Sequence, residues 1–210
     1  MNATVRVQLS IMMFIEFFVW GVWFVTMGTY LGTLKFSGTA IGSAYSTTNW
    51  GAIVAPFIVG MIADKFFSAE RVLGVLHLVG AGIMWYLSTV TDPTQFFFVA
   101  LAYAVCYMPT ISLVNAISFE QMADPAKEFP SVRVLGTLGW IVAGLLVGWM
   151  GVEATHIPLQ LAAASSLLMG IYSFSLPHTP PKSHGKKVTI SDVLGLEALS
   201  LMKERSFAIF

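Results

Sequence analysis

Charged residues are scarce in this chain of 210 residues: 10% are Asp, Glu, Lys or Arg, whereas 56% are hydrophobic. Soluble domains carry about 25% charged residues, which cover their surface with hydrated groups. Lys plus Arg (11) balance Asp plus Glu (11), so the basic excess that binds nucleic acid is missing. These shortages exclude an ordinary soluble domain and a nucleic-acid partner, and they indicate a polytopic membrane protein.

Cysteine is nearly absent, and the histidines do not cluster. The single Cys106 rules out an internal disulfide framework, and the four His residues lack the spacing of metal ligands. Aromatic residues reach 13%, so the composition is not that of a disordered chain. We therefore expect an all-α membrane protein that is not an enzyme and needs neither a metal nor a cofactor.

Long charge-free runs set the expected topology. A bilayer core of about 30 Å requires roughly 20 helical residues per crossing. Between Arg6 and Lys35 the only charge is Glu16, and five further runs contain none. The runs predict six transmembrane helices, which we place near residues 9–32, 40–63, 72–90, 95–118, 132–151 and 157–176. Together they form a predicted six-helix domain over residues 1–178.

The basic residues predict the orientation in the membrane. Six crossings put both chain ends on one side, and Lys35 is the one basic residue on an odd-numbered connection. The positive-inside rule then predicts cytoplasmic termini. The other basic residues fall at the N-terminus or on even-numbered connections: Arg6, Lys65, Arg71, Lys127, Arg133, Lys182, Lys186, Lys187, Lys203 and Arg205.

The composition of the sequence changes after residue 178. Residues 179–206 begin with a Pro-, Lys- and Ser-rich stretch, which predicts a cytoplasmic linker. Between Ser191 and Lys203 apolar and polar residues alternate, which predicts an amphipathic interfacial helix. Residues 207–210 are apolar, and we expect them to be the start of a truncated seventh span.

Glu16 is the one ionisable residue inside the first predicted span. Burial disfavours the charged form of a carboxyl, so Glu16 is a candidate for proton coupling or for accepting a substrate hydrogen bond. The alternative is that Glu16 lies shallow at the cytoplasmic interface and the tryptophans form an aromatic belt or a packing seam. On a helix, four large side chains share its face: Trp20, Trp23, Met27 and Tyr30.

The fifth predicted span carries a polar stripe, which we call the fifth-span stripe: Arg133, Thr137, Trp140 and Gly144. These residues lie on one helical face and offer a cation, a hydroxyl and a stacking plane. Arg133 and Trp140 are about 10 Å apart along the axis, comparable to a small heteroaromatic ligand with a polyol. In the alternative interpretation Arg133 snorkels to the headgroups and Trp140 packs. The glycines Gly144 and Gly148 also predict a helix-packing face.

The sequence gives weaker indications of function for other polar residues. Gly60, Asp64, Lys65 and Arg71 join spans two and three in a tight charged loop, which could latch the cytoplasmic side or be a solvated loop. Asn115 is a candidate substrate ligand, although interhelical hydrogen bonding explains most such residues. His77 is better explained as hydrogen-bonded structure than as a proton relay.

The ordered set of short motifs along the chain resembles the bacterial nucleoside:proton symporters of the major facilitator superfamily. The tight loop after span two resembles the loop motif of the superfamily as a whole. The matching segments cover essentially the whole chain: Phe17…Trp20-Gly21…Trp23, Gly28-Thr29-Tyr30, Leu34-Lys35-Phe36, Ile41-Gly42…Tyr45-Ser46, Ala63-Asp64-Lys65, Met108-Pro109-Thr110, Phe129-Pro130…Arg133…Gly136-Thr137, Leu176-Pro177-His178, Leu194-Gly195-Leu196 and Ala208-Ile209-Phe210.

The resemblance implies the N-terminal six-helix half of a twelve-span fold in the bacterial inner membrane. It implies proton-coupled nucleoside uptake, with Arg133, Thr137 and Trp140 in the nucleoside site, Asn115 and Trp20 as further candidates, and the C-terminal half missing. Trp140 stands where the family commonly has Phe, and Glu16 where relatives have Gln, so the family does not support a proton role for Glu16. The stretch from 121 to 129 is shorter than the family connection.

Three other functions compete with nucleoside transport. Another small polar solute such as a sugar could be carried, or the six spans could be a non-transporting subunit. An intramembrane protease would need a nucleophile beside a base at membrane depth. His77 is the only histidine well inside a predicted span, and no Gly-x-Ser-x-Gly motif presents a serine; Ser43 and Ser46 are the serines that a probe would test.

Overall fold

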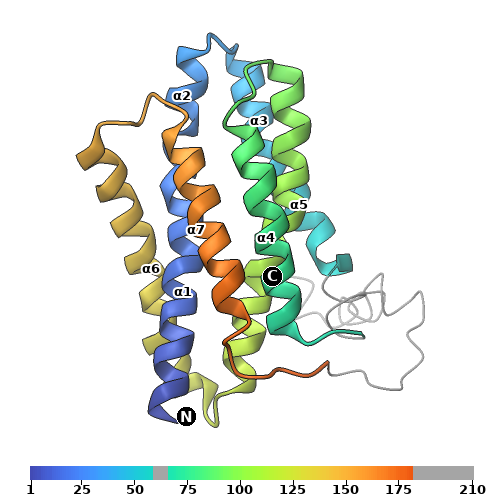
Figure 1. The fold of residues 1–210 in the computed structure, drawn as a ribbon, viewed down its shortest axis with the longest axis vertical. Coiled ribbons are helices and arrows are strands. Elements are labelled where there is room, and N and C mark those ends of the chain that lie inside the picture. Colours follow the sequence, from blue (N-terminus) through green and yellow to red (C-terminus); the bar gives the residue numbers. More distant parts are fainter. Residues whose placement is uncertain (59–65, 182–210) are drawn as a thin grey trace, which may run out of the picture.

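The computed structural model describes residues 1–58 and 66–181, and in these ranges the chain forms seven helices and no strand. The first two helices are nearly continuous and make one crossing, so the helices give six crossings, as predicted (Figure 1). Their bounds are α1 Ala3–Phe24, α2 Met27–Thr33, α3 Gly38–Ile58, α4 Ala69–Leu87, α5 Pro93–Glu120, α6 Pro125–Met150 and α7 Ile157–Ser173.

Local capping explains several helix ends. The Asn2 side chain accepts a hydrogen bond from the Thr4 amide, and Asp92 Oδ1 accepts from the Gln95 amide. Pro93 then occupies the first turn of α5, where its missing N–H costs nothing. At the other end of α6, Gly151 takes a left-handed conformation with φ 63°.

Two predicted helix starts are wrong. Helix α1 begins at Ala3 rather than near residue 9, because Asn2 caps it. Helix α6 begins at Pro125 rather than near residue 132, so Pro130 lies inside the helix and not in its first turn. Glu16 and Arg133 are therefore both more than one turn from a helix end, and α6 reaches 26 residues.

A side-chain hydroxyl interrupts the first crossing. The Tyr45 hydroxyl on α3 donates to the Phe24 carbonyl at 3.0 Å and accepts from the Gly28 amide at 2.9 Å. In an unbroken helix these two backbone groups would bond to each other. The inserted hydroxyl satisfies both groups, which explains why α1 ends and α2 begins here.

The helices pack through close contacts in three pairs. Helix α1 packs mainly against α6, α3 against α5, and α4 against α7. Gly139 on α6 lies so close to Phe14 of α1 that a side chain at Gly139 would collide with the Phe14 carbonyl. Gly144, which the sequence placed on a packing face, faces open space among the described residues, so none of their helices packs against it.

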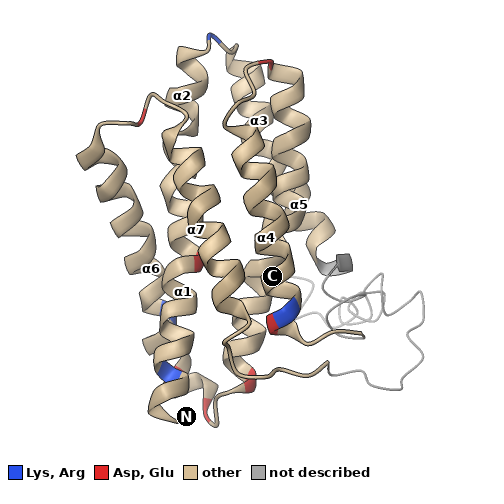
Figure 2. Ribbon diagram, in the orientation of Figure 1, with Lys and Arg blue, Asp and Glu red and all other residues tan. Residues whose placement is uncertain are grey.

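Charged residues of the described part gather towards the two ends of the helices (Figure 2). The N-terminus and the segment after α7 lie at one end, and the loops after α2, α4 and α6 lie at the other (Figure 1). Three described helical segments are long and apolar enough to cross a membrane: Ala3–Thr33, Pro93–Glu120 and Pro125–Met150. The predicted linker helix and the start of a seventh span lie outside the described residues.

Candidate functional site

Arg133 is held against an aromatic ring of the neighbouring helix. Its guanidinium carbon lies 3.9 Å from the centre of the Phe17 ring on α1, a cation–π contact. Gly136 makes room for this contact, because a side chain there would meet both the Phe17 ring and Nη1 of Arg133. Arg133 is therefore positioned by α1 instead of extending along the helix surface toward the headgroups.

Trp140 and Trp20 meet where α6 crosses α1. Their ring centroids are 5.4 Å apart and nearly perpendicular, at 83°. Phe24 continues the cluster at 5.5 Å from Trp20, and Tyr45 follows at 5.2 Å from Phe24. Trp20 and Trp140 are only partly buried, so this aromatic cluster (Trp20, Phe24, Tyr45 and Trp140) reaches the surface of the six-helix unit.

Several polar groups of the predicted site are uncommitted within the described ranges. The Arg133 guanidinium has no carboxylate or hydrogen-bond partner there, and Thr137 is exposed one turn further along α6. The indole N–H of Trp20 and Oδ1 of Asn115 are buried without a hydrogen-bond partner. Because buried polar groups nearly always have partners, these two atoms are candidates to bind a ligand together with the fifth-span stripe.

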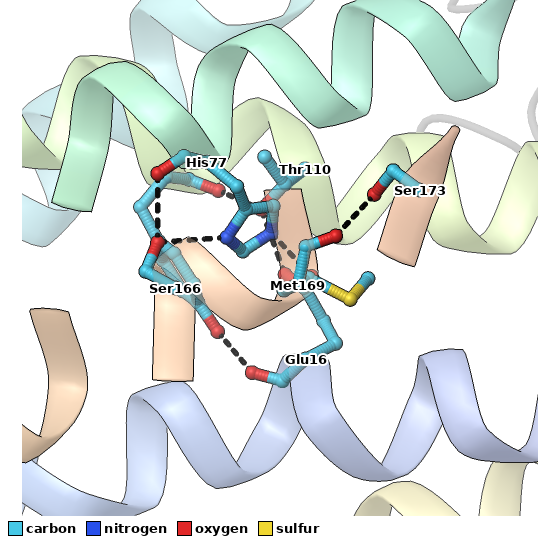
Figure 3. A network of polar contacts seen from close by, with 7 residues as sticks. Glu16, His77, Thr110, Ser166, Met169 and Ser173 are labelled. Carbon is cyan, nitrogen blue, oxygen red and sulfur yellow. Dashed lines mark hydrogen bonds and ion pairs between the residues drawn. The ribbon is translucent and has the colours of Figure 1, made fainter. Parts of the chain in front are cut away.

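Glu16 points away from this surface into the bundle, where it joins a buried polar network of Glu16, His77, Thr110 and Ser166 (Figure 3). Its Oε2 lies 2.8 Å from Nε2 of His77 on α4, and its Oε1 accepts from the Thr110 hydroxyl on α5 at 2.7 Å. On the other side of the imidazole, Nδ1 lies 2.9 Å from Oγ of Ser166 on α7. Side chains from four helices thus meet at one buried point.

This network is sealed from solvent in the described part of the chain. Glu16 and Thr110 are 0% exposed, and His77 and Ser166 are 1% exposed. The alternative that Glu16 lies shallow at the interface is therefore wrong. The hydrogen bonding expected for His77 is confirmed by its two side-chain contacts.

The network contains the residue types of a serine-hydrolase triad in a different arrangement. In such triads the serine bonds Nε2 of the histidine and the carboxylate bonds Nδ1. Here Ser166 is on Nδ1 and Glu16 on Nε2, and the Ser166 hydroxyl donates to the His77 carbonyl at 3.0 Å. Ser166 is also too buried to meet a substrate. The arrangement suits holding a proton better than nucleophilic attack.

The other predicted neighbours of Glu16 form a packing seam and not a belt. Trp23, Met27 and Tyr30 are 3%, 2% and 7% exposed. The ring of Trp23 packs edge-on against Tyr103 of α5 at 5.7 Å. The packing alternative is therefore the one that holds for these three side chains.

Most of the predicted latch lies outside the described residues. Residues 59–65 contain Gly60, Asp64 and Lys65, whose structure is not described, and Arg71 is exposed on the first turns of α4. The described part shows instead a contact that the sequence reasoning missed. Glu70 accepts from the Thr179 amide at 3.0 Å and lies 2.9 Å from Nδ1 of His178. This contact ties α4 to the segment after α7.

Sequence reasoning also missed the pairing of Glu16 with His77 and the contacts of this pair with Thr110 and Ser166. The available signal was that both histidine and glutamate are rare at membrane depth and usually pair with each other or with backbone. In the described residues, no three His, Cys, Asp or Glu side chains gather as metal ligands.

The comparisons with known proteins agree along the whole chain. Residues 1–210 match the family described as Nucleoside H+ symporter. The protein named as nucleoside transporter YegT in Escherichia coli (strain K12) is 44% identical to this chain, over 97% of this chain and 49% of its own length. The xanthosine permease of the same organism is 40% identical over 99% of this chain and 51% of its own length.

Solved structures show the same fold. The crystal structure of the nucleoside transporter NupG (D323A mutant) matches with a TM-score of 0.89 at 36% identity, over 98% of this chain and 52% of that chain. A peptide transporter POT in complex with sulfate matches with a TM-score of 0.66 at 17% identity, which shows the fold alone. The chain spans about half the length of the curated relatives it matches. It is an integral membrane protein with the fold of an N-terminal half of the major facilitator superfamily, and it belongs to the nucleoside H+ symporter family.

Proposed function

We propose that the full-length protein containing this chain takes up nucleosides across the bacterial inner membrane, driven by the proton gradient. The six-helix unit supplies one half of the nucleoside site, and a second half of similar length covers it. Alternating access in this class of transporter is a rocking of one half against the other around a midplane site. A six-helix unit alone is therefore expected to bind weakly and not to transport.

The observation that carries this proposal is the partly open surface where α6 crosses α1, in a chain that matches a nucleoside symporter family from end to end. Trp140 offers a ring face or edge for the base, since every base has a π-face. Arg133 and Thr137 supply donors for the polar groups of the sugar or base. The indole N–H of Trp20 and Oδ1 of Asn115 add a donor and an acceptor.

Three further assignments belong to the same proposal. Both termini face the cytoplasm, as the distribution of basic residues favours. Gly60, Asp64, Lys65 and Arg71 latch the cytoplasmic side in one conformation. Glu16 takes part in proton coupling, although it does so from inside the bundle, where it contacts His77 instead of the nucleoside surface.

Uptake of radiolabelled uridine into proteoliposomes that contain the full-length protein tests the function. We expect accumulation that needs an inward proton gradient and that unlabelled nucleosides abolish, because base and ribose both contribute to binding. Competition by a sugar but not by nucleosides would instead support the alternative of a sugar carrier. If the protein bound and transported neither nucleosides nor sugars, the result would support the alternative of a non-transporting subunit.

A further inference from the structure

Side chains from four helices meet at the junction around Glu16 and His77. We propose that the Glu16–His77–Ser166 group is a proton-binding site of the N-terminal half, separate from the nucleoside surface, with Thr110 as a positioning residue. This inference deepens the proposed function, on which it rests, by naming the groups that take up the proton.

The number of hydrogens available to the hydrogen bonds gives the protonation state of the Glu16–His77 pair. A hydroxyl has one hydrogen, and that of Ser166 donates to the His77 carbonyl. Nδ1 of His77 must then donate its own hydrogen to Ser166 Oγ, 2.9 Å away. Nε2 and Glu16 Oε2 are 2.8 Å apart, so a further hydrogen lies between them. The pair thus carries one shared proton and is neutral overall, either as acid and imidazole or as carboxylate and imidazolium.

The same heavy-atom positions also fit the state without that proton. The imidazole then keeps its hydrogen on Nε2 and donates it to the Glu16 carboxylate. Nδ1 becomes an acceptor, and the Ser166 hydroxyl rotates from the His77 carbonyl to Nδ1. The hydrogen bonds between the side chains of the group are all kept, whereas the bond from Ser166 to the His77 carbonyl is lost. The departing proton passes to water in the transport pathway. Binding or loss of one proton changes the net charge of the group between zero and minus one.

The surroundings favour the neutral, proton-loaded state in the conformation described. The pair is completely buried, and a buried unpaired charge is disfavoured. The titratable groups of α5 on this side are Tyr107, whose ring packs edge-on against His77, Tyr103, which stacks on Tyr107, and Cys106 one residue before Tyr107. On α7, Tyr172 bonds to the Gln8 carbonyl on α1. On α6, the cation of Arg133 lies over the ring of Phe17, the residue next to Glu16 in the chain. Release of the proton therefore needs a conformation that admits water.

Tyr107 gives this group a direct connection to the aromatic cluster. Its hydroxyl donates to the Glu16 backbone carbonyl at 2.7 Å, and its ring packs edge-on against His77 at 5.9 Å. The same ring contacts Trp20 at 6.2 Å. A change of charge on the pair is thus felt by a side chain that lines the proposed nucleoside surface.

Glu16→Gln in the full-length protein tests the proposal. A glutamine amide can donate to Nε2 of His77 and accept from Thr110, so it reproduces the proton-loaded contacts but cannot release a proton. Proteoliposomes would be assayed for gradient-driven uptake and for nucleoside counterflow, which needs no proton gradient, between about pH 5 and 8. We expect the ratio of uptake to counterflow to fall about tenfold or more, and the pH midpoint of uptake to move by about one unit or more.

Glu153→Gln is the matched control, since Glu153 follows α6 in the loop before α7 and makes no contact with the buried group. It should keep the wild-type ratio and pH profile. A folded Glu16→Gln protein with a wild-type ratio and pH profile would overturn the proposal and make the pair a static tie. Failure of Glu16→Gln to fold would also overturn the proposal. The neutral amide should make the same hydrogen bonds as the proton-loaded Glu16, so the variant should fold if that state is the one described.

Infrared difference spectra between acid and alkaline buffer separate this inference from the proposed function. We expect Glu16→Gln to remove the difference band of one carboxyl group, in its acid or carboxylate form, from the spectrum of the purified full-length protein, and Glu153→Gln to retain that band. This signal does not depend on which solute is carried. Loss of the band in a protein that carries no nucleoside would sink the proposed substrate and leave the proton site standing.

Discussion

Arg133 owes its position to a ring and a missing side chain. It contacts the face of Phe17, and Gly136 leaves the space that this contact occupies. A guanidinium on an aromatic face keeps its N–H donors free at its edges. This geometry explains how the half-buried Arg133 can be held in one orientation and still be available to a ligand.

Replacing Arg133 with alanine in the full-length transporter should weaken nucleoside binding. Hydrogen bonds from a charged donor contribute about 1.5–3 kcal/mol, so the dissociation constant should rise about tenfold or more. Equilibrium binding of labelled nucleoside checks this. Lys127→Ala is the control on the same helix, because its side chain is 85% exposed and, among the residues that the structure describes, pairs with Asp124. Equal, small effects of both changes would remove Arg133 from the site.

Trp140 is predicted to stack on the base of the nucleoside. Trp140→Ala should cost about 1–3 kcal/mol of binding, the value of one base–aromatic stack, whereas Trp140→Phe should retain most of it. The same binding assay measures both. Trp149→Ala is the comparison, since Trp149 lies on α6 with 85% of its surface exposed. If Trp140→Ala bound nucleoside as well as Trp149→Ala, the base would have to lie elsewhere.

The sequence predicted the members of the fifth-span stripe because helical periodicity alone places them on one face. It did not predict the partners of Glu16. His77, Thr110 and Ser166 come from three other helices. His77 is 61 positions and Thr110 is 94 positions from Glu16 in the sequence, and Ser166 is 89 positions from His77. Such contacts depend on how helices pack, which no local pattern records.

The first crossing shows a helix broken by another helix. The hydroxyl of Tyr45 satisfies both the Phe24 carbonyl and the Gly28 amide, and its ring packs against Phe24 in the aromatic cluster. The hydropathy of residues 9–32 predicts one continuous span, and it carries no sign of a break. The side chain that causes the break, Tyr45, belongs to α3. The break therefore forms only when α3 packs beside the first crossing.

Tyr45→Phe should weaken this junction. Loss of the hydroxyl leaves two backbone groups without their partner, at a cost of about 1–3 kcal/mol. We expect the Gly28 amide to exchange its hydrogen about tenfold faster or more in the full-length protein. Tyr86→Phe is the control, because the Tyr86 hydroxyl contacts only the exposed Gln95 side chain. An unchanged exchange rate at Gly28 would mean that Tyr45 does not hold the break.

At the scale of the whole molecule, one broad face of α6 has no neighbour among the described residues. Helix α6 packs on α1, and several of its large apolar side chains remain exposed, among them Val134, Leu138, Ile141, Leu145 and Trp149. Lipid or a second half of similar length would cover this face. The length of the relatives, about twice that of this chain, favours a second half next to the fifth-span stripe.

The proposed orientation can be tested with single cysteines in the full-length protein after Cys106→Ala. Thr91→Cys lies in the loop between α4 and α5, and Lys127→Cys lies at the opposite end of the helices. In spheroplasts, a membrane-impermeant maleimide should label Thr91→Cys at once and Lys127→Cys only after permeabilisation, because the basic end faces the cytoplasm. The reverse labelling pattern would contradict the orientation.

The sequence by itself determined the number of crossings, their approximate positions and the stripe on α6. These features follow from local quantities, namely hydropathy, charge and helical period, which act within about 20 residues. The tertiary structure alone decided where Glu16 points, which hydroxyl breaks the first crossing and what holds Arg133 in place. Each of these depends on side chains from different helices sharing one buried volume, and a buried polar group must find its partner wherever the packing of the helices puts one.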